Sequence, residues 1–248
     1  MSTSTIAESI QGALMLARFD RRGLGAFDGS NASARASFNV AWFIIGLYAI
    51  SAILISATVV DGAQTMSEVA SAEIGSEVEA PPSDLLIRFG AVMVLAQIVG
   101  WLTLLSFMYG FLGKGGLQHR YATAVAAYNW TLLWRRAVEL LPIMMGVAGL
   151  GGSIGLIYLA VSAYSIYYLY FTLKAALEEH GFEAAMIVLA EIGLNLVMPA
   201  AALLALSLAY FGTSDVQQLF EALPRTGMDV GPGVPSMLDD PGQSGTGN

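Results

Sequence analysis

The chain has no cysteine and only two histidines, His119 and His180. Without cysteine there is no disulfide, no thiolate nucleophile and no thiolate metal ligand. The two histidines fall in predicted turns, and no paired carboxylates or H-E-x-x-H pattern surround them. The sequence therefore predicts no catalytic residue, no metal site, no cofactor and no enzymatic activity.

Charged residues are also scarce, at 12% of the chain against 56% hydrophobic residues. In soluble domains about a quarter of the residues are charged. The acidic residues that give the net charge of −8 gather between and after the apolar runs, and no basic patch suits a nucleic-acid backbone. We expect the lipid bilayer as a partner and no nucleic acid.

What the chain has instead is long apolar runs. Charge-free stretches extend from Ser37 to Val60 and from Phe89 to Gly113. A helix of about 24 residues is ~36 Å long, enough to cross a hydrocarbon core of ~30 Å. These stretches predict membrane spans over residues 37–60 and 86–112.

Residues 117–139 admit two interpretations, because the segment is apolar yet charged. We favour an amphipathic helix in the membrane interface, or half inserted, because Arg120, Thr131 and other polar residues share one helical face. The residues predicted to contact lipid headgroups are Arg120, Arg135, Arg136, Trp130 and Trp134. In the alternative a span starts near Leu132, and the side chains of Arg135 and Arg136 extend back to the interface.

The 34 uncharged residues between Glu139 and Lys174 exceed one span and fall slightly short of two. Glycines near residue 150 favour a hairpin with spans over 132–150 and 153–173, the second ending in an aromatic belt. A last span is predicted over 184–211. The fold class is thus an all-α polytopic membrane helix bundle of five transmembrane helices, or four if 132–150 does not cross, with additional interfacial helices.

The two ends of the chain differ from this membrane domain, residues 37–212. Residues 1–36 form a predicted cytoplasmic segment with a weakly amphipathic helix, and residues 213–248 form an acidic Pro- and Gly-rich tail that we expect to be disordered. With five spans, nine of the eleven lysine and arginine residues fall on one side. The positive-inside rule then puts the N-terminus in the cytoplasm and the C-terminus outside.

Glu191 and Asn195 are four residues apart in the last span, and so they share one helical face. An ionisable group inside a span indicates a functional site, here a proton or cation site or a partner for Arg135 or Arg136. The alternative is a hydrogen-bonded structural residue between helices.

The Ala-Tyr-Asn-Trp run at residues 127–130, the cytoplasmic segment and five closely spaced helices over about residues 35–212 resemble the bacterial branch of the Yip-domain family. The resemblance implies a small bacterial inner-membrane protein. The Tyr-Gly-Pro type signature of eukaryotic members is absent, and no binding residue is carried over.

Two functions fit these features. The first is a scaffold or accessory component of a membrane process, with another membrane protein or a second copy as its partner and a basic cytoplasmic surface. The alternative is a small transporter or channel component that works through Glu191 and Asn195.

Overall fold

The computed structural model describes residues 6–55, 83–150 and 154–222, and the side chains of residues 6–55, 87–150 and 154–206. Within these ranges every regular element is a helix and none is a strand. The chain divides into two compact units, Met1–Leu206 and Ser207–Asn248. The site described below lies entirely in the first unit.

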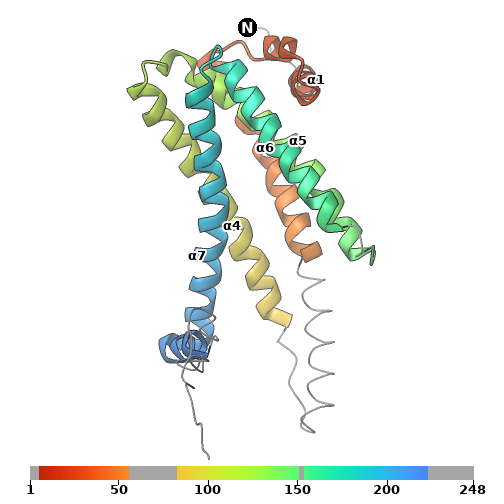
Figure 1. Cartoon of the computed structure of the whole chain (residues 1–248), viewed down its shortest axis with the longest axis vertical. Coiled ribbons are helices and arrows are strands. Elements are labelled where there is room, and N and C mark those ends of the chain that lie inside the picture. The colour runs from red at the N-terminus through yellow and green to blue at the C-terminus, as the bar shows by residue number, and fades with distance from the viewer. Residues whose placement is uncertain (1–5, 56–82, 151–153, 223–248) are drawn as a thin grey trace, which may run out of the picture. The chain divides into compact units, whose positions relative to one another are not determined.

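The first unit begins with short helices and continues with long ones (Figure 1). The N-terminal elements are α1 (Ile6–Ala17), η1 (Arg21–Ala26), α2 (Asn31–Ser37), η2 (Phe38–Val40) and a helix described over 41–55. The following elements are α4 (Ser83–Lys114), η3 (Gln118–Arg120), α5 (Tyr121–Val147), α6 (Ile154–Ala176) and α7 (Gly181–Ala222). Residues 207–222 of α7 belong to the second unit.

Four of these helical stretches are long and apolar enough to cross a membrane, Asn31–Ile55, Ile87–Lys114, Ile154–Ala176 and Gly181–Leu206. Most of their surface is apolar and exposed, as expected where the surrounding solvent is lipid. The predicted all-α membrane helix bundle is confirmed. Residues 56–60 of the first predicted span lie outside the described residues.

A fifth long helix, α5, covers most of two segments that we predicted separately from the sequence, residues 117–139 and the span over 132–150. It is continuous over 27 residues, or ~40 Å, with Pro142 inside it. The nine consecutive residues 124–132 are all buried. Because nine residues cover every face of a helix, this part of α5 is enclosed by protein. Whether residues 117–139 lie in the interface, insert half-way or cross the membrane stays a prediction.

The predicted boundary of the disordered tail, at residue 213, is also too early. α7 continues to Ala222, so residues 213–222 are helical and not part of a disordered tail. These ten residues contain no proline or glycine, and the residues that favoured disorder begin at Pro224. Residues 223–248 lie outside the described residues.

The N-terminal helix α1 packs against η1, α5 and α6 (Figure 1). The hydroxyls of Tyr168 and Tyr164 donate to the backbone oxygens of Ala13 and Ala17, at 2.8 and 2.9 Å. These carbonyls lie in the last turns of α1, where a helix leaves acceptors unpaired. Part of the aromatic cluster that we assigned to a membrane belt therefore holds α1 in place.

Ion pairs join the segments at the end of the unit where α5 and α7 begin. Arg21 of η1 pairs with Glu179 at 2.8 Å, and Arg120 of η3 pairs with Glu178. Lys174 also contacts Glu179, at 3.2 Å. The turn between α6 and α7 is thus fixed to both the N-terminal segment and the start of α5.

The contact between α1 and η1 requires a glycine. A Cβ at Gly12 would lie 2.5 Å from the Cβ of Ala26 and 2.8 Å from the backbone oxygen of Gly23. Gly12→Ala should therefore push η1 away from α1 and lower the free energy of unfolding by about 1–3 kcal/mol. At about 2–4 °C per kcal/mol, thermal unfolding of the purified protein would detect the loss.

The matched control is Gly25→Ala, because a Cβ at Gly25 has nothing within 4 Å. It should unfold at the wild-type temperature or slightly above. Equal melting temperatures for the two variants would contradict the close packing of α1 on η1.

Candidate functional site

A buried ion pair joins α5 to α7 in the interior of the unit. Nη1 of Arg135 donates to both carboxylate oxygens of Glu191, each at 2.9 Å, and each side chain is only 6% exposed. The hydroxyl of Tyr128, two turns before Arg135, donates to the same carboxylate at 3.1 Å. Arg135 lies ~21 Å from the start of α5, so the pair sits near the middle of that helix.

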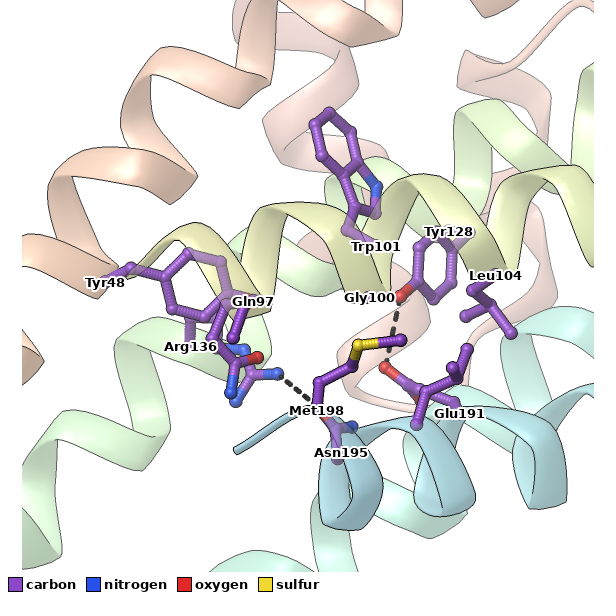
Figure 2. A pocket seen from close by; sticks show the side chains of 12 residues that line it. Tyr48, Gln97, Gly100, Trp101, Leu104, Tyr128, Arg136, Glu191, Asn195 and Met198 are labelled. Carbon is purple, nitrogen blue, oxygen red and sulfur yellow. Dashed lines mark hydrogen bonds between the residues drawn. The ribbon is translucent and has the colours of Figure 1, made fainter. Parts of the chain in front are cut away.

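Arg136 forms a second set of contacts beside this pair. Its Nη1 donates to Glu139 at 2.6 Å, and its Nη2 donates to the side-chain oxygen of Asn195 at 3.3 Å. Its guanidinium also lies 4.9 Å from the centre of the Tyr48 ring, within the range of a cation–π contact. Figure 2 shows Arg136, Asn195 and Tyr48 together with Tyr128 and Glu191.

These charged groups line a cavity of ≈ 470 Å³, within the size range of small-molecule sites. It extends between the helix over 41–55 and α4, α5, α6 and α7. Its polar lining comprises Tyr48, Ser51, Gln97, Arg135, Arg136, Glu139, Tyr158, Ser162, Ser165, Glu191 and Asn195. Its apolar lining includes Met93, Val94, Ile143, Val161 and Ile166.

A second, much smaller pocket of ≈ 10 Å³ adjoins the cavity and is drawn in Figure 2. The two share Tyr48, Gln97, Arg136, Glu191 and Asn195. Its volume is about that of one water molecule, and polar side chains surround it. It can therefore hydrate the charged groups locally, whereas the larger cavity has room for a solute.

Three buried polar atoms of cavity-lining residues have no hydrogen-bond partner in the described part of the chain: Nε of Arg135, Nε of Arg136 and Oγ of Ser165. A buried donor that lacks an acceptor costs about 1–3 kcal/mol, and more when it is charged. These three atoms are enclosed by the protein and do not face the cavity, so they mark imperfect packing around the two arginines.

A separate polar network lies between α2, α4 and α5. The indole of Trp101 donates to the side-chain oxygen of Asn129 at 3.1 Å, and the amide nitrogen of Asn129 donates to Ser37 at 2.9 Å. Asn129 is completely buried. In the run at 127–130, Tyr128 and Asn129 thus contact different neighbouring helices, and both fix the position of α5.

The predicted site residues fall in different places. Glu191 and Asn195 both line the cavity, and Glu191 has Arg135 as its partner. The side chains of Trp130 and Arg135 are buried within the protein, so their assignment to lipid headgroups is wrong. Arg120 pairs with Glu178, Arg136 lies in the cavity, and Trp134 packs partly buried against the core.

Sequence reasoning missed Tyr48, Gln97, Tyr128 and Glu139 as members of this site. Two of them had a signal in their spacing. Tyr128 precedes Arg135 by seven residues and Glu139 follows Arg136 by three, so each pair shares a helical face. Tyr48 and Gln97 come from other helices, and no spacing along the chain relates them to the arginines.

No protein-family model, curated protein or solved structure matches the chain. The resemblance to the Yip-domain family stays a prediction. In the part of the chain that the structure describes, no three histidine or carboxylate side chains are grouped as ligands for a metal ion.

The pair of Arg135 and Glu191 can be tested by charge removal. Glu191→Gln leaves Arg135 buried without a counter-ion and should lower the free energy of unfolding by about 3–5 kcal/mol. The double variant Arg135→Gln with Glu191→Gln contains no unpaired charge and should be closer to wild type than either single variant. Thermal unfolding of the four proteins measures the coupling.

Glu183→Gln is the matched control, since Glu183 is in the first turn of the same helix and only partly buried. It should change stability by less than about 1 kcal/mol. Additive losses in the Arg135 and Glu191 variants would contradict the ion pair.

Proposed function

We propose that the protein is a small membrane transporter or channel component that takes a solute with charged groups into the cavity beside Arg135 and Glu191. The observation that carries this proposal is the cavity itself, ≈ 470 Å³ in volume and lined by two arginines and two glutamates within the helix bundle. Ionisable groups at membrane depth are costly and typically mark a pathway for solutes or ions.

The scaffold hypothesis depended on spans that carry few polar groups. When each helix is considered alone this description is correct, since each span has at most a few polar groups. Taken together, the polar groups of five helices face one cavity. A scaffold has no need of that concentration, whereas a solute pathway does. For this reason we place the transporter or channel function first and propose no catalytic step.

The proposal predicts that water reaches the cavity. A cysteine introduced at Ser162, which lines the cavity, should react with a charged, membrane-impermeant thiosulfonate reagent, because only a hydrated thiol ionises and reacts. The chain has no other cysteine, so the signal is specific. Labelling of membrane vesicles from each face in turn measures whether the pathway opens to both sides.

The matched control is Ala163→Cys, the next residue of α6, which is exposed on the surface of the bundle and does not line the cavity. In lipid its thiol should stay unreactive. Labelling at neither position would contradict a solute pathway and return the scaffold function to first place.

We also propose that the protein resides in a bacterial inner membrane, with five crossings, the N-terminus in the cytoplasm and the C-terminus outside. α5 packs along α6, which supports a crossing by α5 in addition to the four apolar stretches. The basic residues Arg18, Arg21 and Arg22 lie in the N-terminal segment, on the cytoplasmic side in this topology.

Ser244→Cys should accordingly react with an impermeant maleimide added to intact cells, and Ser2→Cys should react only after the membrane is permeabilised. The readout is the mass shift of the labelled protein on a gel. If Ser244→Cys is protected in intact cells, the five-crossing topology is wrong.

A further inference from the structure

The four ionised side chains of the cavity balance one another. Arg135 and Arg136 contribute two positive charges, and Glu139 and Glu191 contribute two negative ones. A ligand with a net charge would leave an uncompensated charge in a medium of low polarity, which is strongly unfavourable. A ligand with one positive and one negative group keeps the cavity neutral.

The two arginines indicate where the negative group binds. Arg135 and Arg136 are adjacent residues of α5, and both line the cavity. Guanidinium N–H groups form their strongest hydrogen bonds with carboxylate or phosphate oxygens. The carboxylates of Glu139 and Glu191 are acceptors for the N–H groups of an ammonium.

The rim of the cavity indicates what else the ligand carries. Four lining residues, each from the surface of a membrane helix, are exposed: Ile55, Tyr158, Ile166 and Leu196. The exposed apolar surface of a membrane bundle contacts lipid. The cavity therefore opens towards the hydrocarbon of the bilayer, and an apolar chain can extend from it over this rim.

We propose that the cavity binds a zwitterionic amphiphile: its phosphate lies against the guanidinium groups of Arg135 and Arg136, its ammonium lies against Glu139 and Glu191, and its apolar chains cross the rim. The inference rests on the proposed function, since it names the substrate class of the same site. The shared chemistry, an anionic oxygen group and an ammonium, also occurs in a free zwitterion without chains.

The test uses the full-length protein in mild detergent with equal amounts of phosphatidylethanolamine, which is zwitterionic, and phosphatidylglycerol, which is anionic. Native mass spectrometry counts the lipids retained per chain. We expect one phosphatidylethanolamine, bound about tenfold more tightly than phosphatidylglycerol. A second titration adds free glycerophosphoethanolamine, a phosphodiester with no net charge that has the headgroup without the chains.

Two variants on α6 separate binding in the cavity from binding elsewhere. Ser162→Phe places a ring inside the cavity while leaving the two ion pairs in place, and should reduce retention of phosphatidylethanolamine about tenfold. Ala163→Phe adds the same bulk to the exposed face of the helix and should retain the lipid as wild type does. Thermal unfolding establishes that both variants are folded.

Displacement of the lipid by free glycerophosphoethanolamine at equal concentration would support the zwitterion and assign it to a soluble source. Equal retention of the two lipids, or wild-type retention by Ser162→Phe, would overturn the inference. Reaction of Ser162→Cys with a water-soluble reagent does not depend on the ligand. A reactive cysteine without lipid preference would thus refute the zwitterion alone, and an unreactive cysteine would refute the proposed function.

Discussion

The buried ion pair between Arg135 and Glu191 is the constraint on which the arrangement of the bundle depends. Neither charge reaches solvent, so each must meet the other at the same depth. Arg120 and Glu178, which pair at the start of α5 and α7, lie ~22 and ~20 Å before Arg135 and Glu191 respectively. The two helices therefore run in the same direction, fixed in register at two levels.

The other polar contacts extend this register to the neighbouring helices. Lipid offers little hydrophobic drive for helices to associate, so packing and interhelical hydrogen bonds decide which faces meet. Asn129 joins α5 to Trp101 and Ser37, and Tyr128 joins it to Glu191. Adjacent residues of α5 thus bind the helix to α7 on one side and to α2 and α4 on the other. This explains why the most polar of the long helices is also the most enclosed.

The four apolar stretches were predictable because hydropathy belongs to each segment alone. The single continuous helix α5 was not predictable. A hydropathy scale counts Arg135, Arg136 and Glu139 only as unfavourable in a membrane. The group that offsets the cost of Arg135 is 56 residues further on, in α7. Glu191 was recognised as exceptional for its depth, and Arg135 or Arg136 was considered as its partner. Tyr48 and Gln97 could not be found, because only the packing of separate helices brings them to the arginines.

A purely structural role explains the ion pairs but not the space beside them. A structural pair is most stable when its remaining donors are satisfied and its surroundings are densely packed. Here Nε of both arginines lacks a partner, and a cavity of ≈ 470 Å³ replaces the side chains that would otherwise pack there. Both features cost stability, since unpaired donors lose hydrogen bonds and an open cavity loses dispersion contacts. A ligand that fills the volume restores the lost dispersion contacts, and this makes binding the simplest reason for the cavity to persist.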